Sequence, residues 1–173
     1  MKLKQMLAGA LAFAVVSGSG LPTQAAPTQK YLEILARALS FAIDGPAGEI
    51  ETAIVYVPGN AASEAEKAEL VALLGNGLQI GKVVLKGKAV PATDADAAKA
   101  KLWLVTSGAG AKATPLAGSK VFTASTEKGC AEAAQCVLAI ETEPKVQIYV
   151  SRKAADVTGV SFQNSFLVMV KEL

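Results

Sequence analysis

The chain has 173 residues, with 17 basic side chains, 15 acidic side chains and no histidine. This near balance of charge argues against a nucleic-acid partner and against a polybasic membrane patch, both of which need a basic surplus. The missing histidine excludes a Ser-His-Asp triad, a Cys-His pair and a histidine metal site.

The first 25 residues have the three-part layout of a secretory signal peptide. Lys2 and Lys4 give a positive start, Met6 to Val16 form an uncharged apolar run, and Thr23-Gln24-Ala25 offers a cleavage site. The run is shorter than the roughly 20 residues that a membrane span needs, and an ordinary buried helix is the alternative. We expect cleavage after Ala25 and export to the periplasm, without direct membrane insertion. One domain, residues 26–173, remains.

The first mature element is a predicted helix from Tyr31 to Ile43, which Gly45-Pro46 ends. Its apolar residues recur at helical spacing: Leu32, Leu35, Leu39 and Ala42. A β-rich apolar run from Ile50 to Val57 then predicts a strand, because Pro58-Gly59-Asn60 follows it as a turn.

A second helix is predicted to start at a capping box, Ser63-x-x-Glu66, and to run to about Leu74. Ile80 to Val90 is expected to form a second strand region.

A short alanine-rich helix is expected from Asp94 to Lys99, with Thr93 as its cap. Two further strands are predicted at Leu102 to Val105 and Lys120 to Thr123. The first of them is apolar throughout, as buried parallel strands are.

The C-terminal part predicts an antiparallel hairpin, from Val137 to Thr142 and from Val146 to Val150. Ser151 is expected to cap a short helix that Gly159 ends. Phe162 to Val170 is expected to be helical. Strands alternate with helices, so the sequence predicts an α/β fold: a single layered domain with a largely parallel sheet flanked by helices and a C-terminal antiparallel hairpin.

The only two cysteines, Cys130 and Cys136, predict a disulfide in an oxidising compartment. The residues between them favour helix, yet six residues of α-helix rise about 9 Å. A disulfide tolerates a Cα separation of about 7 Å at most. We therefore expect a bent loop or one tight turn after Gly129. Whether the bond is a structural staple or redox-sensing is left open.

Motifs that would indicate catalysis are missing or incomplete. Gly108-x-Gly110-x-x-Ala113 follows a strand, but Pro115 interrupts the helix that a dinucleotide would need. The sequence has no P-loop and no G-x-S-x-G motif. We expect no enzyme activity, no cofactor and no metal.

The C-terminal stretch from Val146 to Lys171 resembles the end of the YfiR family of periplasmic regulators. It reads Val-Gln-Ile-Tyr-Val-Ser, then Ala154-Ala155, then Thr-Gly-Val-Ser-Phe, then Phe166-Leu167. At the front, Phe41 to Pro46 resembles that family's Phe-x-x-Trp-Pro motif, although the tryptophan is missing. Ser151 replaces the usual asparagine. The resemblance covers most of residues 26–173 in the order of its elements.

The resemblance implies a regulator that binds the periplasmic sensing domain of a membrane protein, a diguanylate cyclase, and lowers cyclic-di-GMP. We predict that Gln147 and Tyr149, on one face of the hairpin, contribute to the partner surface; burial of this face is the alternative. A homodimer is left open. The alternative function is a small-ligand-binding periplasmic domain, whose crevice would be lined by the loops Pro58–Asn60 and Ser107–Lys112.

Overall fold

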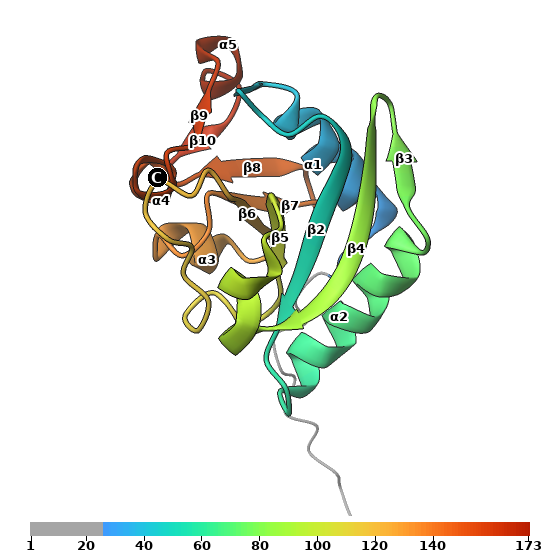
Figure 1. Ribbon diagram of the computed structural model, residues 1–173. Coiled ribbons are helices and arrows are strands. Elements are labelled where there is room, and N and C mark those ends of the chain that lie inside the picture. Colours follow the sequence, from blue (N-terminus) through green and yellow to red (C-terminus); the bar gives the residue numbers. More distant parts are fainter. Residues whose placement is uncertain (1–25) are drawn as a thin grey trace, which may run out of the picture.

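An eight-stranded, mostly parallel sheet flanked by helices dominates the computed structural model, which describes residues 26–173 (Figure 1). The sheet includes the C-terminal antiparallel hairpin, so the predicted α/β fold is confirmed. The predicted signal peptide lies outside the described residues. None of the helices in these residues combines the length and the apolar composition of a membrane span.

Six helices and ten strands follow one another along the described chain. The helices are α1 (Gln29–Leu39), α2 (Ala61–Leu74), the 3₁₀-helix η1 (Ala92–Ala98), α3 (Lys128–Glu132), α4 (Arg152–Thr158) and α5 (Asn164–Leu167). The strands are β1 (Ala42–Ile43), β2 (Gly48–Tyr56), β3 (Leu78–Ile80), β4 (Val83–Pro91), β5 (Leu102–Val105), β6 (Phe122–Ser125), β7 (Leu138–Glu141), β8 (Gln147–Val150), β9 (Ser161–Phe162) and β10 (Lys171–Glu172).

The strand order of the main sheet is β10-β8-β7-β6-β5-β2-β4-β3. β2 pairs in parallel with β4 on one side and with β5 on the other. The chain therefore builds one half of the sheet after leaving β2 and the other half after leaving β5. The carboxyl ends of these two strands form the topological switch point, where open α/β sheets commonly bind ligands.

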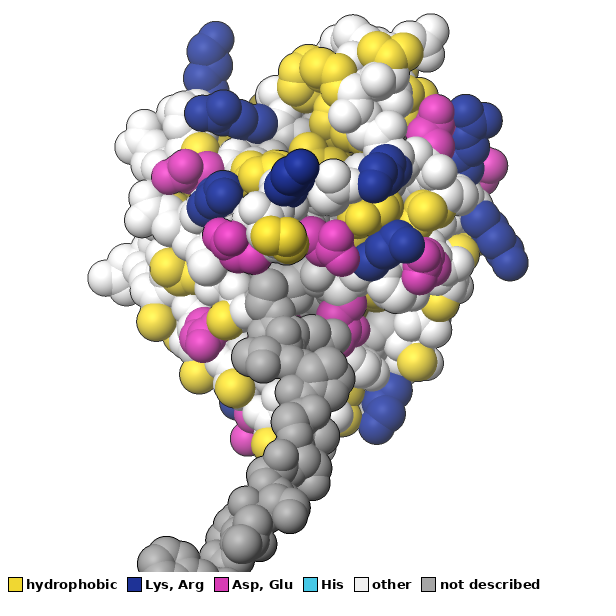
Figure 2. Space-filling view, turned by 180° about the vertical axis from the view of Figure 1, so that it is seen from behind, with side chains coloured by type: hydrophobic (Ala, Val, Ile, Leu, Met, Phe, Trp, Pro, Cys, Tyr) yellow, Lys and Arg dark blue, Asp and Glu magenta, His cyan; other side chains and the backbone are white. Residues whose placement is uncertain are grey.

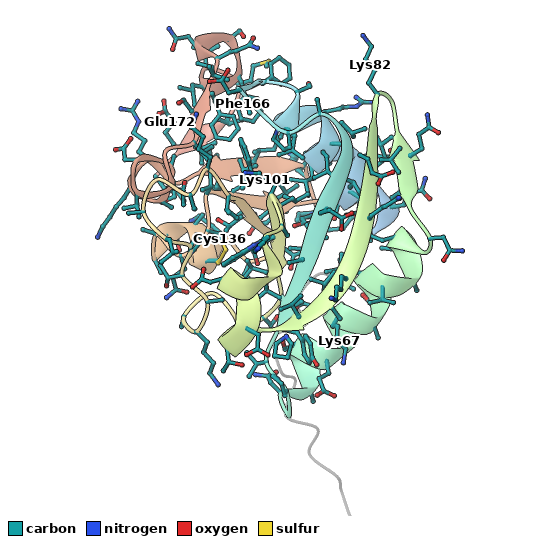
Figure 3. The ribbon with its side chains drawn as sticks, viewed as in Figure 1. Lys67, Lys82, Lys101, Cys136, Phe166 and Glu172 are labelled. Carbon is teal, nitrogen blue, oxygen red and sulfur yellow. A yellow bond between two sulfur atoms is a disulfide. The ribbon has the colours of Figure 1, made fainter. Side chains whose placement is uncertain are left out.

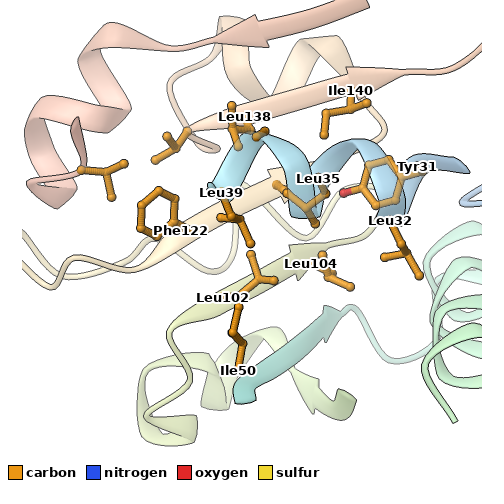
Figure 4. Close-up of a cluster of buried hydrophobic side chains, with 14 of the residues drawn as sticks. Tyr31, Leu32, Leu35, Leu39, Ile50, Leu102, Leu104, Phe122, Leu138 and Ile140 are labelled. Atoms are coloured by element: carbon orange, nitrogen blue, oxygen red, sulfur yellow. The ribbon is translucent and has the colours of Figure 1, made fainter. Parts of the chain in front are cut away.

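The larger core lies between one face of the sheet and the helices α1 and α2. The apolar stripe of α1 is buried there, and Figure 4 shows its side chains meeting Ile50, Leu102 and Leu104 of the strands. The hydroxyl of Thr28 caps α1 by accepting a hydrogen bond from the N–H of Tyr31 at 3.2 Å. Each large apolar side chain in this core stabilises the fold by about 1.5–3 kcal/mol.

The opposite face of the sheet is covered by η1, by the loop 106–121 and by α3. Its core is rich in alanine and contains the single tryptophan, Trp103. Loop 106–121 joins the parallel strands β5 and β6 without a helix. Pro115, expected to interrupt a helix after β5, lies within this loop.

Several predicted boundaries are wrong. The first helix ends at Leu39, because Ala42 leaves it to pair with Phe162 of β9. The expected strand region 80–90 is two strands that turn at Gly81, whose φ is 59°. Thr93 does not cap η1, which starts after Pro91 and has no side-chain cap. The strand predicted from Lys120 to Thr123 starts and ends two residues later, as β6 (Phe122–Ser125).

The predicted helix from Phe162 to Val170 is also wrong. Only α5 is helical in this segment, which β9 precedes and β10 follows. The ring of Phe162 packs edge-on against Phe122 at 6.0 Å and lies 5.1 Å from Phe166. These tertiary contacts, with the pairing to β1, override the helical propensity of the segment.

Candidate functional site

Four polar side chains are buried where β2 and β5 end, and we call them the switch-point cluster: Ser63, Glu66, Thr106 and Ser107. Two come from the first turns of α2, and two follow β5. The cluster lies under the exposed loop Pro58–Asn60. The structure thus brings together the two loops that the ligand-binding alternative named, and fills the space beneath them with hydrogen-bonded side chains.

The capping box predicted at Ser63 and Glu66 is wrong. Asn60 caps α2 instead, with its side-chain oxygen accepting from the N–H of Ser63 at 3.1 Å. The helix starts one turn earlier than expected, so both side chains of the motif point into the sheet edge. Sequence analysis missed their role because Ser-x-x-Glu has the same spacing as a capping box.

The serine of the cluster joins α2 to β2 and β5. Its Oγ accepts from the N–H of Val57 at 2.8 Å and lies 2.6 Å from the hydroxyl of Thr106. The Thr106 hydroxyl donates to the carbonyl of Val55 at 2.9 Å, so its one proton is used there. The shared hydrogen bond is therefore donated by Ser63.

The carboxylate of the cluster, Glu66, accepts from Ser107 twice. The backbone N–H of Ser107 donates to Oε2 at 3.1 Å, and its hydroxyl donates to Oε1. Burial raises the pKa of Glu66, the two hydrogen bonds from Ser107 lower it in part, and the charges of Glu127 and Glu69 raise it further. Burial also raises the pKa of Tyr31, and the charge of Glu66 adds to that rise.

This arrangement suits a structural role better than catalysis. The hydroxyl of Ser107 donates to a carboxylate, but the side chain is only 5% exposed. A nucleophile must reach its substrate, and this one is covered. The cluster holds α2 against the ends of β2 and β5.

The predicted disulfide between Cys130 and Cys136 is present, with a Cα separation of 5.3 Å (Figure 3). The chain makes one short helical turn, α3, and reverses at Ala134, whose φ is 56°. The N–H groups of Gln135 and Cys136 both donate to the carbonyl of Cys130, at 2.9 and 3.1 Å. The expected tight turn is therefore confirmed.

The two hairpin residues predicted for the partner surface lie on β8, on the face opposite Ile148. Tyr149 is only 6% exposed, and its hydroxyl donates to Glu141 at 3.1 Å. The ammonium groups of Lys128 and Lys171 lie 5.3 and 5.5 Å from its ring centre. Gln147 is half-buried, and its Oε1 has no hydrogen-bond partner among residues 26–173. This face offers little accessible surface at Tyr149.

Exposed apolar side chains gather elsewhere, on the lobe formed by β1, β9 and α5. We call Ile43, Val168 and Met169 the apolar tip; they are 53%, 84% and 64% exposed. Figure 2 shows hydrophobic side chains at the top of the molecule, where α5 lies in Figure 1. The stacked rings of Phe41 and Phe166, 5.3 Å apart, fasten α5 to the segment before β1. The wrongly predicted helix hid this tip from sequence analysis.

Comparison with protein-family models finds no match, and comparison with curated proteins finds none either. The resemblance to the YfiR family rests on the quoted residues alone.

Proposed function

We propose that the protein is a non-catalytic periplasmic regulator that binds a membrane-anchored signalling protein through its apolar tip. The partner is the periplasmic sensing domain of an inner-membrane diguanylate cyclase, which the regulator holds inactive and so lowers cyclic-di-GMP. The resemblance to the YfiR family supplies this partner.

The exposure of the apolar tip carries the proposal. Val168 and Met169 are large apolar side chains that the fold leaves in solvent, beside a lobe whose aromatic residues are buried. Large apolar side chains that gather exposed on one lobe of a folded domain commonly mark a protein interface. The disulfide fits an oxidising compartment outside the cytoplasm.

The test is complementation of a deletion strain, with intracellular cyclic-di-GMP as the readout. The deletion is expected to raise cyclic-di-GMP, and the wild-type gene to restore it. The double variant Val168→Ser/Met169→Ser is expected to fail, although its thermal stability stays close to wild type because both side chains are exposed. Val71→Ser is the matched control, since Val71 on α2 is 46% exposed and lies away from the tip.

Full restoration by the tip variant would contradict the proposal. If the tip variant instead changes the protein from a dimer to a monomer in sedimentation, the tip is an interface between two copies of this chain.

A second candidate is the small-ligand-binding domain. The observation in its favour is the meeting of the Pro58–Asn60 and Ser107–Lys112 loops over the switch point. Unchanged signalling in the deletion strain, together with calorimetric binding of a small solute that Asn60→Ala weakens, would favour this candidate.

A further inference from the structure

A cavity of about 230 Å³ opens at the amino ends of β5 and β6, at the opposite end of these strands from the switch-point cluster. It lies between the end of η1 and the last part of loop 106–121. Its charged and polar lining comes from Asp96, Lys99, Lys101 and Ser119, and its apolar lining includes Trp103 and Leu116.

Two lysines reach this cavity for local reasons. Lys101 and Trp103 are two residues apart at the start of β5, so both side chains lie on the same face of the sheet. Figure 3 shows Lys101 in the middle of the molecule. Lys99 ends η1 in a left-handed conformation, with φ of 51°. The backbone reverses there, and Lys99 is the second lysine that lines the cavity.

The charged side chains that line the cavity are not neutralised by ion pairs within the described fold. In residues 26–173, no salt bridge pairs Lys99, Lys101 or Asp96. Elsewhere the described lysines near carboxylates do form pairs, such as Lys86 with Glu49 at 2.7 Å. Two positive charges and one negative charge therefore surround the cavity and favour an anionic occupant.

Trp103 is one of the lining residues of the cavity, and its side chain carries an unmet hydrogen bond. Trp103 is 2% exposed, and its Nε1 has no hydrogen-bond partner among the described residues. A buried N–H without an acceptor costs about 1–3 kcal/mol. An oxygen atom of a ligand that reaches the indole edge would supply the acceptor.

We propose that this cavity binds a small organic anion, a carboxylate carried on a flat apolar body. The apolar body would lie against Leu116, which is 67% exposed, and touch only the edge of the largely covered Trp103. The carboxylate would face Lys99 and Lys101, with one oxygen accepting from the indole N–H. A cavity of about 150 Å³ holds benzene, so this volume admits a benzene-sized body with a carboxylate attached. The inference does not depend on the partner proposed above.

The test is titration of the folded, oxidised protein with benzoate, followed by the fluorescence of the single tryptophan and by calorimetry. Benzoate is expected to bind saturably and to change the emission of Trp103. Benzyl alcohol has the same body without the charge, and acetate has the charge without the body. Both are expected to bind about tenfold more weakly or not at all, because each lacks one half of the recognition.

Lys101→Gln is expected to weaken benzoate binding by about three- to tenfold, as the loss of one solvent-exposed charge contact would. Lys82→Gln is the matched control: Lys82 lies on the turn between β3 and β4 and does not line the cavity (Figure 3). Trp103→Phe keeps an aromatic wall and removes the N–H, and its calorimetric affinity is expected to fall.

Three results would overturn the proposal. The first is a lack of saturable benzoate binding by both methods. The second is equal affinity for benzoate and benzyl alcohol. The third is an equal effect of the Lys101 and Lys82 substitutions, each shown by its melting curve to be folded.

Discussion

Ser107, at the end of β5, donates both its backbone N–H and its hydroxyl to the carboxylate of Glu66 on α2, 41 residues earlier in the chain. Both side chains are buried. This pair joins the helix after β2 to the loop after β5, so it fixes the two loops of the switch point relative to each other.

Replacing the carboxylate by an amide is expected to change how stability depends on pH. The pKa of Glu66 in the fold lies above its ordinary value of 4.5, so the folded protein holds this proton more tightly than the unfolded chain. The contribution of this group to the free energy of unfolding is fully present below the ordinary value of 4.5, and it is lost as the pH rises through the raised pKa. In Glu66→Gln the side-chain amide does not ionise and has nearly the same shape as the carboxyl group. Its stability relative to wild type is expected to rise with pH by up to about 1.4 kcal/mol per unit in that window.

Melting curves of wild type and Glu66→Gln between acidic and neutral pH provide the measurement. Glu69→Gln, on the same helix but exposed, is the control and is expected to follow the wild-type profile more closely. Parallel profiles for wild type and Glu66→Gln would contradict the prediction.

Ser63→Ala is expected to destabilise the fold by about 1–3 kcal/mol. The substitution removes the acceptor of the buried Val57 N–H and the donor to Thr106. Ser40→Ala is the matched control, because the Ser40 hydroxyl is exposed and donates only to the carbonyl of Arg37. Urea unfolding of the two variants compares the costs; equal costs would mean that the cluster adds nothing to stability.

Reduction of the disulfide is expected to lower stability by about 2 kcal/mol without unfolding the domain. The bond closes a loop of six residues beside β7, whereas the larger core lies on the other face of the sheet. Thiol titration of the protein before reduction is expected to find no free thiol. Global unfolding on reduction, or two free thiols beforehand, would be the contrary result.

Gly110→Ala is expected to destabilise the protein by about 1–3 kcal/mol. An added Cβ would lie 2.7 Å from Cys130 Sγ and 2.9 Å from Gln135 Oε1, so the disulfide corner must move. Gly129→Ala, next to Cys130 on α3, is the matched substitution: nothing lies within 4 Å of its added Cβ, and α3 gains a better helix former. In thermal melts, the melting temperature of Gly110→Ala is expected to fall below that of wild type. The melting temperature of Gly129→Ala is expected to equal or exceed that of wild type.

Export is expected to remove the first 25 residues. N-terminal sequencing of the exported protein is expected to begin at Ala26, because Thr23 and Ala25 supply the small residues that signal cleavage needs. A cytoplasmic protein that keeps Met1 would contradict both the export and the expected oxidation of the cysteines.

Secondary-structure elements that depend on interactions between residues close in the sequence could be predicted. The stripe from Leu32 to Leu39 predicts the buried face of α1, and the Cys130–Cys136 spacing predicts the tight turn. The hairpin of β7 and β8 pairs Ile140 with Ile148 across the expected turn. In these cases the deciding interactions span fewer than about a dozen residues.

Features set by distant contacts could not be predicted. Ser63 and Thr106 are 43 residues apart, and the Ser-x-x-Glu spacing fits a cap equally well. Asn60, one turn earlier, caps α2, so the side chains of Ser63 and Glu66 face inward. The segment from Phe162 to Val170 is predicted as one helix, yet Phe162 pairs with Ala42 of β1, more than 100 residues earlier, and only Asn164–Leu167 is helical.

The unequal covering of the two sheet faces has a consequence for hydrogen exchange. Leucines of α1 and α2 cover one face, whereas alanines, η1 and a long loop cover the other. Opening the alanine-rich layer exposes less apolar surface, so it costs less free energy than opening the leucine-rich layer. We therefore expect the amide protons of η1 and of loop 106–121 to exchange with solvent faster than those of α1, and solvent to reach Trp103 from that side before the domain unfolds.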